Sequence, residues 1–288
     1  MEQILHITSG DIAGENLRKT GIFGEVFVWR DVLYDGPRKP GWPEDDMLQA
    51  RAGFLEMLTG GGLGKGHILE TLRTQYEKLP GAKDFDAIIL WFDACLFDQS
   101  MLCHILTCMK IKGMETAKLI CVDAFPGIEP FDGLGQLLPE QLASVHNRRQ
   151  SVTKAQFSFA ERVDRAFALQ DESELKNLAS LRNAPLSCVP TAAARWLLEQ
   201  PDEATGLGQL DRLALRAVRS GLNTPDEIFI YAKTHDLHPI FWGDITLWAK
   251  INNLATRKPP LVRLEGPVPL LPQWNNIEMI KAFRIHPA

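Results

Sequence analysis

The sequence of 288 residues contains no uninterrupted apolar run of about 18 residues, the length that a membrane-spanning helix needs. Its first residues lack a basic segment followed by an apolar stretch and a small-residue cleavage site, so no export signal is predicted. With 45% hydrophobic residues, the chain can still fill a sizeable core. These features predict a cytoplasmic globular protein without membrane attachment.

Cysteine is scarce, and its spacing is irregular. The five cysteines include no C-x-x-C pair, and they are scattered through apolar runs. This usage is typical of reduced thiols in the cytoplasm. Cys103 and Cys108 flank His104, but the missing C-x-x-C pair argues against a structural zinc site.

A strong positive charge is also absent, since the formal net charge is −5. This balance argues against a wholly basic nucleic-acid binder, but the charge is uneven along the chain. Residues 1–150 carry a net −6 and residues 151–205 a net −2, whereas residues 206–288 have 10 Lys and Arg against 7 Asp and Glu. The last segment is therefore the one part of the chain with a positive balance.

Four short apolar runs predict strands in the first half of the chain: QILHITS (3–9), EVFVWR (25–30), DAIILWF (86–92) and AKLICVD (117–123). Helical patterns lie between them, around 12–20, 44–59, 65–79 and 99–111. Strands that alternate with helices indicate a parallel sheet with both faces covered, because parallel strands need crossover connections. We therefore predict that residues 1–150 form a Rossmann-like α/β domain.

The stretch LTGGGLGKGH (58–67) contains five glycines. No strand precedes it and no Gly-Lys-Ser/Thr closes it, so we interpret it as a turn between helices and not as a nucleotide cradle.

Beyond residue 151 the sequence is mainly helical. Residues 151–205 are predicted to form a helical connecting region with three helices. Residues 206–288 contain three further helical patterns, then PPLVRLEG as a strand with IEMIKAFRI as its candidate partner. Three helices followed by two strands is the order of a winged-helix module, which we predict for this segment.

Polar residues follow each predicted strand. In an open parallel sheet the ligand crevice lies at the carboxyl ends of the strands, so these residues are the candidate site. Carboxylates gathered there could hold a Mg²⁺ ion bridged to a substrate phosphate, with Arg38 as further positive charge. The candidate ligand-binding residues are Ser9, Gly10, Asp11, Arg30, Asp31 and Asp123, and Asp93 is the candidate catalytic residue.

Asp93 is singled out because it leaves an apolar strand beside Trp91 and Phe92, where burial raises a carboxyl pKa toward the range useful for acid/base catalysis. Helix capping explains the same set of carboxylates without a ligand, since Asp is a favoured N-cap residue. The sequence leaves both interpretations open.

The opening turn, HITSGDIAGENL, has its own alternatives. A strand followed by Gly-Asp-Ser presents the serine of one hydrolase class, but Ile12 stands in the serine position and has no nucleophilic oxygen. Two interpretations remain. Gly10 could allow a phosphate to approach the amides of the following helix, or Asp11 could hold a substrate hydroxyl or a cation.

The alternative site is the helix GDITLWAKINNLATRK (243–258). Polar residues recur there at helical spacing, and Asn, Lys and Arg on one stripe can contact a DNA major groove. A solvated helix face explains the same stripe. The candidate nucleic-acid contacts are Thr246, Lys250, Asn253 and Arg257.

Several motifs together carry a family resemblance: LHITSGDIAGENL, VFVWRDVLYDGP, LWFDACLFDQSMLCHIL, DGLGQLLPEQLASV, TGLGQLDRLALRAV and FWGDITLWAKINNLA. With them the chain resembles the bacterial family built on domain of unknown function 1835 over most of its length. The resemblance implies a cytoplasmic bacterial protein with an α/β N-terminal domain and a helical C-terminal part, and it implies no established reaction. Where that family has Gly-Asp-Ser and Trp-Phe-Glu-His-Asp-Leu, this chain has Ile12 for Ser, Asp93 for Glu and Ala94 for His.

The leading hypothesis from the sequence is a protein that binds a phosphorylated small molecule, in the first place a nucleotide, at the strand ends. The rival hypothesis is a ligand-responsive DNA-binding regulator that docks through residues 206–288. A third is a non-catalytic scaffold for protein partners.

Overall fold

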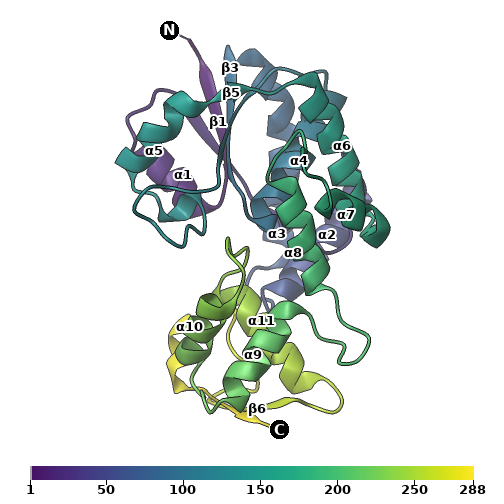
Figure 1. The fold of residues 1–288 in the computed structure, drawn as a ribbon, viewed down its shortest axis with the longest axis vertical. Coiled ribbons are helices and arrows are strands. Elements are labelled where there is room, and N and C mark those ends of the chain that lie inside the picture. Colours follow the sequence, from purple (N-terminus) through teal and green to yellow (C-terminus); the bar gives the residue numbers. More distant parts are fainter. Residues whose placement is uncertain (1) are drawn as a thin grey trace. The chain divides into compact units, whose positions relative to one another are not determined.

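The computed structural model describes residues 2–288, which divide into two compact units (Figure 1). Unit 1 comprises the chain up to Ala52 together with Leu69–Leu197, and unit 2 comprises Gly53–Ile68 with Leu198–Ala288. The segment predicted as a connecting region therefore contributes residues 151–197 to unit 1 and residues 198–205 to unit 2. Within residues 2–288, no helix combines the length and the hydropathy needed to cross a bilayer.

Unit 1 is built on a five-stranded sheet in the order β2-β1-β3-β4-β5. The strands are β1 (Ile4–Ser9), β2 (Glu25–Trp29), β3 (Ala87–Asp93), β4 (Lys118–Val122) and β5 (Gln150–Ser151). The first four are parallel, and only the short edge strand β5 is antiparallel to its neighbour. This topology confirms the prediction of an α/β unit with a mostly parallel sheet.

Helices cover both faces of this sheet, as Figure 1 shows. The helices of unit 1 are α1 (Asp11–Arg18), α2 (Asp45–Leu58), α3 (Lys65–Lys78), α4 (Leu96–Ile111), α5 (Pro139–Val145), α6 (Lys154–Ala168), α7 (Glu172–Ala179) and α8 (Val189–Glu199). Parts of α2, α3 and α8 belong to unit 2. Short 3-10 turns are η1 (Leu79–Asp84), η2 (Leu134–Gln136) and η3 (His146–Arg148).

The two faces differ in how they are filled. On one face, Leu17 of α1 and Leu142 of α5 pack with Trp91 and Ile120 of the sheet in one apolar cluster. On the other face lies α4, which packs between β3 and α6. Almost every residue of α4 is buried, because its sequence is apolar on all sides of the helix. The register of α4 brings its first turn to the carboxyl end of β3.

Unit 2 contains α9 (Gln209–Arg219), α10 (Pro225–His235), α11 (Asp244–Thr256), β6 (Val262–Glu265), the 3-10 turn η4 (Ile277–Ala282) and β7 (Arg284–Pro287). The strands β6 and β7 pair antiparallel, and α9 packs against both α10 and α11. The order of three helices and two strands is the one predicted. In addition, the Ile285 amide donates to the Asn223 carbonyl at 2.8 Å, so the segment before α10 touches β7 at one point.

The glycine-rich stretch is the turn between α2 and α3. A Cβ at Gly62 would lie 2.3 Å from Trp274 Cβ, and the Gln273 and Asn275 side chains donate to the carbonyls of Leu58 and Gly62. The glycines therefore let the 273–275 segment approach the backbone closely, which is a packing role within unit 2.

Candidate functional site

The turn after β1 places an uncapped helix end at the carboxyl edge of the sheet. Gly10 has φ of 69°, a left-handed conformation that favours glycine, and a Cβ there would meet nothing within 4 Å. It is the N-cap of α1, and no side chain caps this end. The first amides of α1 therefore lack the side-chain acceptor that usually satisfies one of them.

Asp11 forms an ion pair instead of a cap. The Arg30 side chain donates from Nε at 2.9 Å and from Nη2 at 2.5 Å to the same carboxylate oxygen, Asp11 Oδ1. Both side chains are more than half exposed. The positive charge of Arg30 thus offsets the carboxylate that would otherwise repel an anion from this turn.

The other polar residues at the first and third strand ends form a closed network. Ser9 Oγ donates to Asp98 Oδ1, and the Asp93 amide donates to Asp98 Oδ2 at 2.7 Å. The Asp93 carboxylate accepts from the Cys95 amide at 3.0 Å and from the Leu134 amide at 3.1 Å. All four carboxylate oxygens of the two aspartates therefore have protein donors.

Burial raises the pKa of Asp93, and it raises the pKa of Asp98 well above its usual range, with the negative charge of Asp93 as the second cause. The direction for Asp93 matches the prediction from the sequence. However, Asp93 is only 6% exposed, and a Cβ at Gly133 would lie 2.3 Å from its Oδ2. The geometry gives Asp93 a role in holding the Gly133–Leu134 loop on the strand end, and its assignment as a general base stays a prediction.

Asp31 is buried in an ion pair that the sequence did not reveal. Its Oδ1 accepts from Arg51 Nη2 at 2.7 Å and from the Val32 amide at 2.7 Å. Arg51 also donates to the carbonyls of Asp35 and Pro37, so the pair fixes the loop after β2. Arg38, considered as a further cation for the mouth of the sheet, is likewise buried, in an ion pair with Asp164.

Four of the predicted site residues remain exposed at the strand ends: Gly10, Asp11, Arg30 and Asp123. A Mg²⁺ ion bound by carboxylates from several strands would need Asp31 and Asp93, which are already engaged. Asp93, Cys95 and Asp98 do have potential ligand atoms within 4.8 Å of one another. Since the carboxylate oxygens of this cluster accept hydrogen bonds from N–H and O–H donors, the residues do not fit a metal centre.

The polar stripe predicted on α11 is largely used inside unit 2. Lys250 Nζ lies 3.5 Å from Asp211 Oδ2 and 4.0 Å from Glu199 Oε2. Thr246 is partly buried, and of the four predicted contacts only Asn253 is fully exposed. Arg257 caps the end of α11 and donates to the Thr205 carbonyl at 3.3 Å. The stripe therefore presents no continuous basic face.

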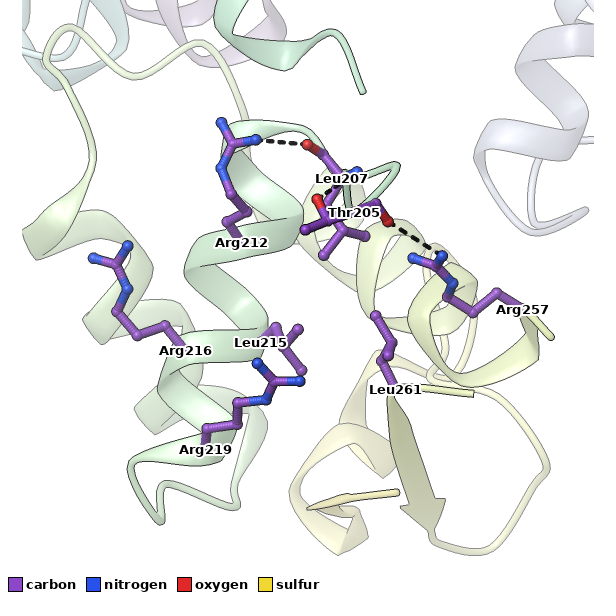
Figure 2. A pocket seen from close by; sticks show the side chains of 8 residues that line it. All are labelled: Thr205, Leu207, Arg212, Leu215, Arg216, Arg219, Arg257 and Leu261. Carbon is purple, nitrogen blue, oxygen red and sulfur yellow. Dashed lines mark hydrogen bonds between the residues drawn. The ribbon is translucent and has the colours of Figure 1, made fainter. Parts of the chain in front are cut away.

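Arginines gather instead around a cavity of about 460 Å³ between α9 and the start of β6. We call it the arginine groove. Figure 2 shows Arg219 of α9 and Arg257 on opposite sides of it. Its lining residues are Thr205, Leu207, Arg212, Leu215, Arg216, Arg219, Arg257 and Leu261.

The arginines of the groove differ in how firmly they are held. Arg212 donates to Asp202 Oδ2 at 2.9 Å and to the Leu207 carbonyl at 2.6 Å, so it is fixed. Arg216 and Arg219 are exposed, and neither has an acidic partner within 4.0 Å among residues 2–288. Their charges are therefore available to a ligand.

A signal for this groove was present in the sequence. Arg212, Arg216 and Arg219 follow the helical spacing i, i+4 and i+7, which places them along one side of α9. The opposite side is apolar and buried, with Leu210, Leu213 and Ala217. The contribution of Leu261 and Arg257, some 40 residues later in the chain, has no local signal.

No protein-family model matches this chain, and a search of curated proteins finds no significant match. The fold and the sites described above are therefore the basis for any functional conclusion.

Proposed function

We propose that the protein binds a phosphorylated small molecule of the nucleotide class, and that the arginine groove of unit 2 holds it. The observation that carries this proposal is a cavity of about 460 Å³ with Arg219 and Arg257 on opposite sides and three leucines in its lining. Guanidinium groups bind phosphate oxygens in pairs of parallel hydrogen bonds. Leu207, Leu215 and Leu261 offer an apolar surface for a base, and the volume lies within the range of small-molecule sites.

The strand ends of unit 1 are the second candidate place for the same class of ligand. The uncapped start of α1 offers backbone amides to an anion, and Arg30 neutralises Asp11 beside it. Arg30 uses Nε and Nη2 in that pair, which leaves the N–H groups of Nη1 for a phosphate. Both places can be tested in one set of measurements.

The test is calorimetric titration and thermal shift of the full-length protein with nucleotides, sugar phosphates and phosphorylated cofactors, each with and without Mg²⁺. A ligand at about 100 times its dissociation constant adds roughly 2.7 kcal/mol to the free energy of unfolding. We expect Arg219→Ala and Arg257→Ala each to weaken binding about tenfold or more, because each removes a charged hydrogen bond worth about 1.5–3 kcal/mol.

Arg263→Ala is the matched control, since it removes one exposed arginine of unit 2 from β6, outside the groove. If Arg30→Ala abolishes binding while Arg219→Ala and Arg257→Ala leave it intact, the ligand lies at the strand ends. If none of the compounds binds, the proposed function is wrong.

A DNA-binding regulator is the second function, and the element order of unit 2 favours it. Three helices and an antiparallel strand pair correspond to the order of a winged-helix module. Because Lys250 and Arg257 are held by contacts within unit 2, the exposed arginines of α9 would contact the phosphates. Binding to a duplex should then weaken linearly with the logarithm of salt concentration, and Arg216→Ala should reduce the slope by about 1. Absence of duplex binding at low salt excludes this function.

A further inference from the structure

A second cavity, of about 290 Å³, lies in unit 1 and is lined by two cysteines from distant parts of the chain. Cys121 belongs to β4 and is exposed, whereas Cys188, which directly precedes α8, is buried. Their sulfur atoms are 3.7 Å apart, with the Cys121 thiol donating to Cys188 Sγ. Cys95, Cys103 and Cys108 are buried as well, and they do not line this cavity. The cavity therefore brings two thiols from distant parts of the chain close together.

The surroundings favour a thiolate at Cys188. Its carbonyl accepts from the Ala192 amide at 3.1 Å, so Cys188 stands at the N-terminal end of α8, where the helix dipole favours negative charge. The hydrogen bond from Cys121 lowers the pKa of Cys188, and the same bond together with burial raises the pKa of Cys121 well above its usual value. The position at the helix N-terminus therefore makes Cys188 the candidate for the thiolate of the pair.

The cavity also holds an unsatisfied polar group. Gln99 is 1% exposed and lines the cavity; its Nε2 donates to the Asp93 carbonyl at 2.5 Å and to Cys121 Sγ at 3.5 Å. Its Oε1 is buried and has no hydrogen-bond partner among the residues that the structure describes. An unpartnered carbonyl oxygen on a residue that lines the cavity can accept a hydrogen bond from the O–H group of a small hydroperoxide.

We propose that Cys188 and Cys121 form a redox couple that hydrogen peroxide oxidises, with Cys188 as the attacking and Cys121 as the resolving thiol. The Cys188 thiolate attacks one peroxide oxygen, the O–O bond breaks, and the other oxygen leaves as hydroxide and takes a proton to become water. Cys188 is then a sulfenic acid. Cys121 gives up its proton, its sulfur attacks Cys188 Sγ, and the S–O bond breaks with release of a second water.

The net reaction converts two thiols and one peroxide into one disulfide and two waters, with two electrons transferred to the peroxide. The two sulfurs must approach from 3.7 Å to the disulfide length of about 2.05 Å. This movement links β4 to the start of α8, and an external thiol reverses it by exchange. The inference does not depend on the proposed function, because it involves none of the same residues.

The test uses the reduced full-length protein, freed of reductant and treated with one equivalent of hydrogen peroxide. Free thiols are then alkylated under native conditions, and the intact mass and the proteolytic peptides are measured. We expect the loss of two hydrogen atoms and one cross-linked peptide pair that contains Cys121 and Cys188. Cys95, Cys103 and Cys108, which do not line the cavity, serve as internal controls and should be recovered as free thiols after denaturation.

Two variants separate the steps. Cys121→Ser should leave a sulfenic acid on Cys188 that a dimedone probe captures, since the resolving thiol is gone. Cys188→Ser should slow consumption of peroxide about tenfold or more, because the remaining Cys121 lies on β4 and has no helix N-terminus to favour its thiolate. If the wild-type protein gives no Cys121–Cys188 cross-link, or if Cys188→Ser reacts as fast as the wild type, the proposal is wrong.

The pH dependence of the oxidation rate provides an independent readout. The titratable and charged groups that face Cys188 are Cys121, Asp93 and Asp123, and Arg148 lines the same cavity. The negative charges of the two carboxylates disfavour a thiolate at Cys188, whereas the hydrogen bond from the Cys121 thiol favours it. We expect the rate to rise with pH through a midpoint below the value of about 8.5 of a free cysteine. A midpoint at or above that value would contradict the assignment of Cys188 as the attacking thiol.

Discussion

Asp164 of α6 is the anion of a buried network that holds three segments of unit 1 together. Arg38 Nη1 donates to Asp164 Oδ1 at 2.6 Å, the Gly41 amide donates to Oδ2 at 2.6 Å, and His104 Nδ1 lies 3.0 Å from Oδ1. The side chains of Arg38 and Asp164 are 4% and 0% exposed. Asp164→Asn would leave the Arg38 guanidinium buried without its counter-charge.

Removal of one partner from a buried ion pair costs about 3–5 kcal/mol, which is a large part of the 5–15 kcal/mol that stabilises a typical protein. For a unit of this size each kcal/mol corresponds to about 2–4 °C, so we expect the thermal midpoint of Asp164→Asn to fall by about 6–20 °C. Differential scanning calorimetry of the full-length protein measures this shift directly.

The matched control is Glu172→Gln, which removes an exposed carboxylate 2.5 Å from Lys176 on α7. Exposed pairs of this kind contribute little, so the control should melt close to the wild type. The double variant of Asp164→Asn with Arg38→Met should lose much less than the sum of the two single losses, because the buried guanidinium is removed together with its counter-charge. An Asp164→Asn midpoint as high as that of the control would refute the reasoning.

Three further outcomes are expected. Burial by itself lowers the pKa of His104, but Cys108 and Asp164 outweigh it and raise the pKa to about 10. The stability that depends on the charged imidazole is therefore fully present below about pH 6.5 and is lost as the pH rises toward 10, at up to about 1.4 kcal/mol per pH unit. Urea unfolding from about pH 6 to 10 should show this slope in the wild type and not in His104→Gln. Gly133→Ala places a Cβ 2.3 Å from Asp93 Oδ2 at a φ of 138°, so it should lower the free energy of unfolding by about 1–3 kcal/mol in the same assay. At Gly81 a Cβ would meet nothing within 4 Å, so Gly81→Ala should be tolerated. Lys250→Ala should lower the thermal midpoint, because Asp211 and Glu199 lose their shared cation. The same variant should leave the salt dependence of any duplex binding unchanged. A weaker salt dependence would show that α11 contacts the phosphates.

The strands of unit 1 were predictable because their signal is local. The runs at 3–9, 25–30, 86–92 and 117–123 correspond to β1, β2, β3 and β4 within one residue at each end. Short apolar runs rich in Ile, Val and Leu between helical patterns have few alternatives to a buried parallel strand. The edge strand β5 has two residues, and two residues carry no periodicity that a sequence pattern can reveal.

The fate of the strand-end carboxylates was not predictable in the same way. Asp31 and Asp123 look equivalent in the sequence, since each follows a strand directly. Asp31 is buried because Arg51, on α2, reaches back to it, whereas Asp123 remains exposed. The packing of segments that are distant in the chain determines which residue becomes the partner of each carboxylate. Local sequence spacing does not reveal that packing. The ion pair between Asp11 and Arg30 has the same origin, because it joins the ends of neighbouring parallel strands.

The Asp93 carboxylate itself has no hydrogen-bonding capacity left over for a ligand, although its backbone carbonyl contacts Gln99 beside the Cys121–Cys188 cavity. A polar side chain at a strand end is useful to a ligand only if the protein leaves some of its donors or acceptors unsatisfied, and Ser9, Asp93 and Asp98 satisfy one another and nearby amides. Polar groups without a hydrogen-bonding or charged partner are found instead at the arginine groove and at the Cys121–Cys188 cavity. The guanidinium of Arg219 has no acidic partner among residues 2–288, and Gln99 Oε1 has no donor among them. Because a buried or clustered group without a partner costs free energy in the absence of a ligand, these two places are where binding would recover it.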